Sequence, residues 1–237
     1  MSNSYFQFKQ FTIWQDKCAM KVGTDGVLLG AWAPIANKRR ILDVGTGTGL
    51  VALMLAQRAQ VDFQITALEV DQDAALQAQE NIALSPWKSS IEVIQEDFTT
   101  YLTQVKYDLI VSNPPYFINS LSCPDHQRSQ ARHNDSLTYD ILLKKVSTLL
   151  DTDGLFTVII PADVSDSVKL IGEKNNLFPL NQLEVFTKPN GEVKRKLITF
   201  SFKHRDCKVE QLLTEVARHQ YSDEYKSLTE DFYLHLK

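Results

Sequence analysis

The sequence has few cysteines and none of the spacings that cysteine-dependent folds need. Cys18, Cys123 and Cys207 are the only three among 237 residues, and no two of them form a C-x-x-C pair. Three widely separated thiols exclude a disulfide framework and argue against a zinc site. We therefore expect a protein of a reducing compartment that binds no metal.

Signals for export and for membrane insertion are also missing. The first residues contain no basic segment followed by an apolar stretch, and no apolar run approaches the length that crosses a bilayer. The sequence shows no repeats, low-complexity tracts or linkers. We expect a cytoplasmic monomer with no membrane partner, built as one domain over residues 1–237. Within it, residues 1–34 form an N-terminal extension and residues 35–237 an α/β core.

The chain has no excess of positive charge, since its formal net charge is −4. This balance counts against a nucleic-acid partner, because phosphate binding favours a basic face. Basic residues nevertheless gather locally, and residues 38–40 are one such cluster. A charge run is usually a solvated face, and that reading stays open beside a role in phosphate binding. The candidate RNA-binding residues are Arg128, Arg132, His133, Lys188, Lys194, Arg195 and Lys196.

Apolar runs and helical patterns alternate from residue 40 onward. This alternation predicts parallel βαβ units in a mostly parallel twisted sheet with helices on both faces. A short extended or hairpin piece near residues 6–13 precedes them. The expected helices are residues 26–32, 50–59, 72–83, 139–150, 162–175, 209–219 and 223–236. The expected later strands are residues 155–160, 180–186 and 196–202.

A glycine-rich turn follows the first strand of the core. Gly45, Gly47 and Gly49 come directly after a strand that ends near Asp43, and a buried helix follows them. Glycines allow positive φ angles and a close approach to a ligand. The G-x-G-x-G spacing differs from the G-x-G-x-x-G of nicotinamide-binding folds. A carboxylate at Asp43 would repel a pyrophosphate but suits a cationic amino acid, which favours S-adenosylmethionine and disfavours a nicotinamide oxidoreductase.

Polar side chains follow each of the next strands as well. Glu69 can accept both hydroxyl groups of an adenosine ribose. Asp97 can accept the adenine amino group, and Phe98 can pack on the adenine ring. A single acid at a strand end is usually a helix cap or part of a solvated turn. Four polar residues in order, with Asn113 as the last, predict a ligand site at the carboxyl edge of the sheet.

Asn113, Pro114, Pro115 and Tyr116 follow the apolar strand of residues 108–112. This tetrapeptide offers an amide oxygen, a backbone carbonyl and an aromatic face at one place. Such a set can hold a planar –NH2 group while its nitrogen attacks an electrophile. The alternative is a proline-rich turn that ends a strand, with Tyr116 in the core.

With these motifs the chain resembles the Rossmann-like class I methyltransferases that use S-adenosylmethionine, and within them the N-P-P-[YF] group that methylates amino groups. Residues 6–11 and 15–32 are similar to the bacterial tRNA adenine-N6 methyltransferases. The resemblance implies N6-methylation of an adenosine in the anticodon loop of valine tRNA, just 3′ of the anticodon. It also implies that Lys21, Gly23, Thr24 and Asp25 enclose the methionine end of the cofactor. Thr24 or Asp25 is alternatively the N-cap of the helix at 26–32.

The same motifs also fit other functions. N-P-P-[YF] enzymes also methylate ribosomal RNA guanine N2, protein glutamine N5 or DNA adenine N6. A non-catalytic RNA-binding protein could retain the same fold. Residues 117–135 show no periodic pattern, and we interpret them as a loop that closes over RNA, or as an insertion without a role.

Overall fold

The computed structural model describes residues 3–18, 20–115, 137–218 and 220–235. Its main element is an eight-stranded sheet with the strand order β10-β8-β9-β7-β6-β3-β4-β5. In chain order the strands are β3 (Arg40–Val44), β4 (Gln64–Glu69), β5 (Ile91–Gln95), β6 (Tyr107–Ser112), β7 (Leu150–Pro161), β8 (Phe178–Phe186), β9 (Val193–Ser201) and β10 (Lys208–Leu213).

All pairings in this sheet are parallel except those of β9, which runs against both β7 and β8. The prediction of a mostly parallel sheet is therefore confirmed. Because β9 is reversed, its first residues lie at the edge where the parallel strands end. The chain thus brings residues 193–196 to the edge at which ligands of α/β sheets bind.

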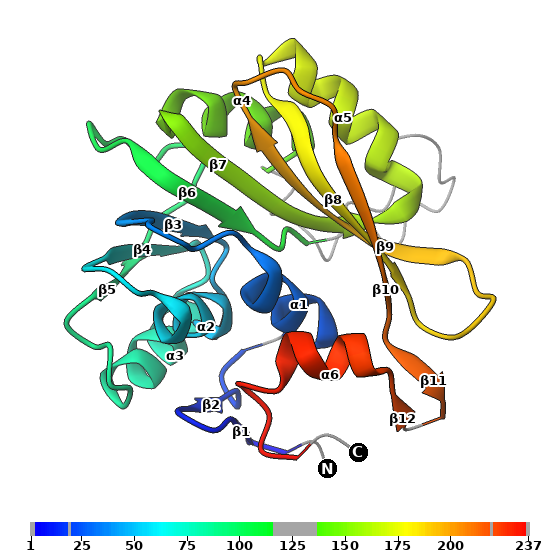
Figure 1. Cartoon of the computed structure of the whole chain (residues 1–237). Helices are drawn as coiled ribbons and strands as arrows, with labels where there is room; N and C mark the ends of the chain where they lie inside the picture. The colour runs from blue at the N-terminus through cyan, green and yellow to red at the C-terminus, as the bar shows by residue number, and fades with distance from the viewer. Residues whose placement is uncertain (1–2, 19, 116–136, 219, 236–237) are drawn as a thin grey trace, which may run out of the picture.

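Helices cover both faces of the sheet (Figure 1). One face carries α1 (Thr24–Trp32), α2 (Leu50–Arg58), α3 (Gln72–Ala83) and α6 (Asp223–Thr229), and the other carries α4 (Tyr139–Leu149) and α5 (Ser165–Lys174). Consecutive strand residues point to opposite faces. Ile41 accordingly packs in the core under α1 and α2, while Leu42 packs in the core under α4. No helix in the described ranges has the length and apolar composition needed to cross a membrane.

The N-terminal segment forms the predicted hairpin, with strands β1 (Tyr5–Gln7) and β2 (Thr12–Trp14). The buried carboxamide of Asn81 in α3 holds it in place. The Asn81 Oδ1 atom accepts the Trp14 N–H at 2.9 Å, and its Nδ2 atom donates to the carbonyls of Trp14 and Thr48, both at 2.9 Å. One side chain therefore ties the hairpin to the turn that contains Thr48.

The two ends of the chain lie side by side (Figure 1). Phe8 forms an isolated antiparallel bridge with Tyr233, and their ring centroids are 5.8 Å apart. The Lys9 N–H donates to the Phe232 carbonyl at 2.8 Å. The side chains of Phe8 and Phe232 are only 1% and 2% exposed. Both ends thus contribute to the same core.

The predicted helix at 209–219 is wrong, because this segment forms β10 and then β11 (Glu215–Ala217), which pairs with β12 (Gln220–Tyr221). Val209, Leu212, Leu213 and Val216 have helical spacing, and that pattern led to the prediction. In the structure Val209 and Val216 are 54% and 49% exposed. Pairing with the open edge of β8 overrides the local pattern.

The predicted helix at 223–236 is only partly confirmed, since α6 ends at Thr229. The chain beyond it turns back toward the N-terminal segment, where Tyr233 stacks on Phe8 and the Phe232 carbonyl accepts the Lys9 N–H. The other predicted helices and strands are present with bounds shifted by a few residues. The strand predicted at 155–160 is longer, because β7 begins at Leu150.

Candidate active site

The glycine-rich turn between β3 and α2 has the backbone that the sequence predicted. Gly45, Gly47 and Gly49 have φ angles of 73°, 57° and 81°, a region that residues with a Cβ rarely adopt. A Cβ atom at Gly45 or Gly47 would meet no heavy atom within 4 Å, whereas one at Gly49 would lie 3.5 Å from Ala78. Gly45 and Gly47 therefore face open space, and Gly49 faces helix α3.

Asp43 lies beneath this turn and is only 1% exposed. Its Oδ2 atom accepts a hydrogen bond from Thr46 Oγ1 at 2.6 Å. The pKa of the Asp43 carboxyl is raised to about 7, mainly by burial. Hydrogen bonds from Thr46 and the Ala52 N–H partly oppose this rise, and the charge of Glu69 contributes to it. Asp43 therefore braces the turn from inside, and a cation bound above the turn would favour its ionised form.

The Asp43→Asn variant is expected to gain stability relative to the wild type as the pH rises from about 4 to about 7. The folded-state pKa exceeds the ordinary value of 3.8, so folding is favoured by the bound proton. That contribution is complete below the unfolded-state pKa and is lost as the pH rises through the folded-state pKa. The difference in unfolding free energy should change by up to about 1.4 kcal/mol per pH unit.

Urea unfolding of both proteins at closely spaced pH values measures this difference. The comparison cancels the other titrating groups, which the two proteins share. If the difference in unfolding free energy between the two proteins is the same at about pH 4 and about pH 7, Asp43 does not carry the buried proton.

Glu69 ends β4 and contacts the glycine turn directly. Its Oε2 atom accepts the Gly47 N–H at 2.8 Å, and its Oε1 atom accepts the Asp71 N–H at 3.0 Å. The side chain is half-buried. Each carboxylate oxygen keeps a second lone pair for a further donor. The side chain is thus fixed in place and can still accept two hydroxyl groups of a ligand.

Asp97 and Phe98 follow β5. The Asp97 Oδ1 atom accepts the Thr99 N–H at 2.8 Å, and the residue is half-buried. Phe98 is 4% exposed and belongs to the core on the α4 side. Lys145 lies 5.5 Å from the centroid of the Phe98 ring and donates to the Thr99 carbonyl at 2.8 Å. The structure therefore places Phe98 mainly in the core, and its contact with an adenine stays a prediction.

Asn113 and the two prolines follow β6. Asn113 is half-buried, Pro114 buried and Pro115 exposed. The described part of the chain supplies no hydrogen bond to the Asn113 carboxamide. The buried Ser112 hydroxyl donates to the Val44 carbonyl at 3.0 Å and joins the ends of β6 and β3. Tyr116, the last residue of the motif, lies outside the described residues.

The strand register places these residues at one level. Val44 lies opposite Leu68 in β4 and opposite Ser112 in β6. The next residues along these three strands are Gly45, Glu69 and Asn113. Adjacent strands are about 4.8 Å apart. The turn glycine thus lies between the ribose-binding candidate and the amide of the N-P-P motif.

The segment before α1 crosses the same edge. The Val22 N–H donates to Gln15 Oε1 at 2.8 Å, and Lys21 is exposed. Burial, together with the nearby charges of Glu69 and Asp71, raises the pKa of the Cys18 thiol to about 11. The Cys18 thiol therefore lies near the end of β4 and stays protonated at neutral pH.

The prediction that Thr24 or Asp25 caps α1 is wrong. The N-cap is Gly23, which makes no side-chain cap bond, and both predicted residues lie in the first helical turn. Asp25 instead accepts a hydrogen bond from Arg195 Nε at 2.9 Å. A Cβ on Gly26 would lie 3.0 Å from Leu50 Cδ2. The start of α1 is thus packed against the start of α2, directly after the glycine turn.

The predicted RNA-binding residues on β9 have partners within the chain. Arg195 pairs with Asp25 as described, and Lys196 pairs with Glu184 at 3.2 Å. Lys194 is exposed and pairs with Glu192, also at 3.2 Å. Lys188 is exposed in the turn between β8 and β9. Arg128, Arg132, His133 and the loop at 117–135 lie outside the described residues.

Two surface hollows lie at the opposite, amino edge of the sheet. One of about 330 Å³ is lined partly by Asp153 and Gly154 near the start of β7, and one of about 460 Å³ by Arg40 and Gln64. Both are remote from the glycine turn. Within the described ranges, no group of three or more His, Cys, Asp or Glu side chains is arranged to hold a metal.

The roles of several residues that shape the site were not predicted from the sequence. Thr46 and Ser112 hold the turn and the end of β6 through buried hydroxyl groups. Asn81 lies on the buried face of α3 between Ala78 and Ile82. A polar residue at an apolar position of a helix was the available signal for Asn81. For Thr46 and Ser112, the sequence offers no indication of a structural role except that both lie next to the motifs.

Comparison with known proteins supports the same fold and identifies the family. The methyltransferase small domain family model matches residues 22–164. A protein of Bacteroides thetaiotaomicron is 64% identical over 237 residues, covering 100% of both chains, and is named tRNA1(Val) (adenine(37)-N6)-methyltransferase. Proteins of the same name in Phocaeicola vulgatus and Photorhabdus laumondii are 49% and 42% identical, covering 100% and 97% of this chain and 100% and 95% of their own.

Solved structures show the same architecture at low sequence identity. A predicted O-methyltransferase of Agrobacterium tumefaciens aligns with a TM-score of 0.64 and 17% identity, over 88% of this chain and 96% of its own. The CcbJ methyltransferase of Streptomyces caelestis aligns with a TM-score of 0.54 and 13% identity, over 76% and 90%. The chain therefore belongs to the methyltransferase small domain family, and within it to the group of proteins named tRNA1(Val) (adenine(37)-N6)-methyltransferases.

Proposed function

We propose that this chain transfers a methyl group from S-adenosylmethionine to N6 of adenine 37 in tRNA1(Val). The chain is an S-adenosylmethionine-dependent methyltransferase, as its family establishes. Relatives that match its whole length carry the name of this reaction. The observation that carries the proposal is the position of Asn113, one strand from Gly45 and at the same level.

The residues at this edge fit the cofactor. Gly45 and Gly47 border open space. The starts of α1 and α2 meet beside it, and free N–H groups at helix starts suit a carboxylate such as that of methionine. The charge of Asp43 suits the ammonium group, and Glu69 suits the ribose hydroxyl groups. We assign Lys21, Gly23, Thr24, Asp97 and Phe98 to the enclosing wall.

S-adenosylmethionine supplies a methyl group on a positively charged sulfur, which makes the methyl carbon electrophilic. The adenine N6 is a weak nucleophile, because its lone pair is delocalised into the ring. Asn113 Oδ1 and the Pro114 carbonyl would accept hydrogen bonds from the two N–H groups of N6. These two contacts would orient the N6 lone pair toward the methyl carbon. As the bond from N6 to the methyl carbon forms, the bond from that carbon to sulfur would break and S-adenosylhomocysteine would leave. N6 becomes tetrahedral and positive, and these acceptors bind it more strongly, which stabilises the transition state. The methylated N6 would then lose one of its protons to water.

The base must leave the stack of the anticodon loop to reach this site. Unstacking a base in a single-stranded loop costs a few kcal/mol. We assign Tyr116 as the residue that stacks on the base, and Pro115 as its neighbour in the motif. We assign Lys188 and Lys194, which are exposed near this edge, together with Arg128, Arg132 and His133, to phosphate contacts.

The purified chain with labelled S-adenosylmethionine is expected to methylate a tRNA1(Val) transcript to nearly one group per molecule. Because the amide and carbonyl acceptors fit an –NH2 group, nucleoside mass mapping should find N6-methyladenosine, and only at position 37. The matched control is the same transcript with guanine at position 37, which should stay unlabelled.

Transfer to ribosomal RNA, DNA or a protein glutamine instead of the transcript would contradict the proposed substrate. Binding of RNA without transfer would favour a non-catalytic RNA-binding protein. Loss of N6-methyladenosine from position 37 in cells that lack the gene would confirm the assignment in the organism.

A further inference from the structure

An ion pair joins two segments that are 170 residues apart in the sequence. Arg195 Nε, near the start of β9, donates to Asp25 Oδ2, in the first turn of α1, at 2.9 Å. The two side chains are 30% and 23% exposed, so the pair is partly shielded from water. Partly shielded charges interact more strongly than fully exposed ones. The pair therefore fixes the start of α1 to the sheet.

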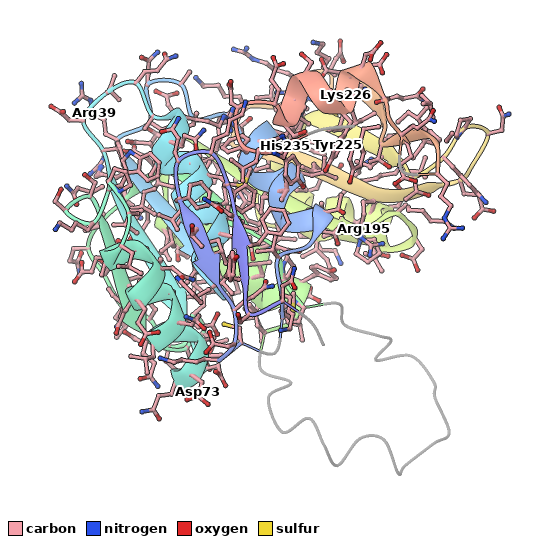
Figure 2. The ribbon with its side chains drawn as sticks, turned by 90° about the horizontal axis from the view of Figure 1, so that it is seen from below. Arg39, Asp73, Arg195, Tyr225, Lys226 and His235 are labelled. Carbon is pink, nitrogen blue, oxygen red and sulfur yellow. The ribbon has the colours of Figure 1, made fainter. Side chains whose placement is uncertain are left out.

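Arg195 lies beside the acceptor half of the site. It is opposite Pro161, the last residue of β7, and β7 pairs with β6, which leads to Asn113. Figure 2 shows Arg195 beside one end of α1 and Arg39 at the opposite side of the molecule. The positive charge of Arg195 also acts on Tyr139 at the start of α4, although burial and Asp163 together raise the pKa of Tyr139 to about 12.

Asp25 lies beside the cofactor half. The next residue, Gly26, packs so closely on Leu50 that an added Cβ would lie 3.0 Å from it. Leu50 is the first residue of α2 after the glycine turn. A displacement of the first turn of α1 would therefore move the wall of the cofactor pocket.

We propose that Asp25 and Arg195 form a positioning pair that holds the cofactor wall against the acceptor edge and so couples cofactor binding to RNA binding. This rests on the proposed function for the identity of the two ligands. It changes the interpretation of both residues: Asp25 supports the pocket through Arg195, and Arg195 supports it through Asp25. Arg195 then affects RNA affinity indirectly, because it fixes the position of α1 at the carboxyl edge of the sheet.

The neighbouring ion pairs on β9 provide matched controls. Lys196 pairs with Glu184 of the adjacent strand β8, with side chains 17% and 19% exposed. Lys194 pairs with Glu192 two residues away. Neither pair involves a residue of α1. Lys196→Gln thus removes a charge of the same sign from the same strand without touching α1.

The experiment measures binding of S-adenosylhomocysteine by calorimetry in the full-length chain. Asp25→Asn and Arg195→Gln are each expected to weaken binding about five- to tenfold, and the double variant by no more than either single variant. Arg195→Lys keeps the positive charge but lacks the planar set of N–H donors of the guanidinium group. It should therefore recover part of the lost S-adenosylhomocysteine affinity. Lys196→Gln should stay within about twofold of the wild type.

Kinetics with tRNA separate positioning from a purely structural role. Positioning predicts that Asp25→Asn and Arg195→Gln raise KM for tRNA by similar factors, while kcat at saturation falls less than about threefold. Additive losses in the double variant would overturn the proposal, as would a rise in KM for tRNA with Arg195→Gln alone and unchanged cofactor affinity. The latter result would make Arg195 a direct RNA contact.

Failure of the proposed function would look different. S-adenosylhomocysteine binding does not depend on the methyl acceptor, so the coupled loss of affinity in the two single variants can be observed even if the acceptor is another amine. In that case the tRNA transcript would remain unmethylated by the wild type.

Discussion

Replacing Asn113 with alanine is expected to lower kcat about 10²- to 10³-fold, the effect of removing one group that stabilises transition-state charge. The dissociation constant for S-adenosylmethionine should stay within about threefold, because the amide contacts the acceptor more than the cofactor. Single-turnover transfer to tRNA1(Val) measures the first quantity, and calorimetry measures the second. Equal losses in rate and in cofactor affinity would contradict the assigned role.

Ser112→Ala is the matched control for Asn113→Ala. Ser112 is the preceding residue, and its buried hydroxyl donates to the Val44 carbonyl. Loss of this bond should cost about 1 kcal/mol of stability. A fall in kcat for Ser112→Ala as large as that for Asn113→Ala would show that any disturbance of this strand end abolishes transfer.

Replacing Glu69 with alanine is expected to weaken cofactor binding about 10²-fold, because two hydrogen bonds to a charged acceptor would be lost. Glu69→Gln should weaken it nearly as much. Both carboxylate oxygens accept backbone N–H groups, from Gly47 and from Asp71. A glutamine would turn its –NH2 group toward one of these donors. Calorimetry with S-adenosylhomocysteine measures both variants.

Asp71→Asn is the control for this prediction. Asp71 lies two residues further on and caps α3 by accepting the Ala74 N–H at 2.8 Å. Asparagine caps a helix about as well as aspartate. Its cofactor affinity should therefore match the wild type. Wild-type affinity in Glu69→Ala would reject the assignment of Glu69 to the ribose.

Much of the site could be predicted because its parts are local. A strand that runs into closely spaced glycines and then a buried helix defines the turn, and the positive φ angles of Gly45, Gly47 and Gly49 confirm it. Asn113 could be placed beside that turn because parallel strands end at one edge. The mostly parallel sheet followed from the alternation of strands and helices, whereas the reversal of β9 had no signal in the sequence.

The remaining features depend on contacts between distant segments. The helical spacing of Val209 and Val216 was misleading, because the open edge of β8 determines the conformation of that segment. The partner of Arg195 is 170 residues away, and a basic run gives no sign of it. The complete burial of Asp43 depends on Thr46 and on the packing of α2 above it. A strand-end acid in the sequence gives no measure of that burial.

The meeting of the two chain ends has a consequence for synthesis. The Phe8 ring stacks on Tyr233, and the Lys9 N–H donates to the Phe232 carbonyl, so the partners of this segment are made long after it. The aromatic hairpin around Phe8 therefore stays without its partner until residues 232 and 233 have been synthesised. Contacts between segments so far apart form slowly, and exposed apolar surface in that interval favours aggregation or capture by chaperones. Replacing Tyr233 with a small residue would leave the Phe8 ring without this partner even in the finished fold.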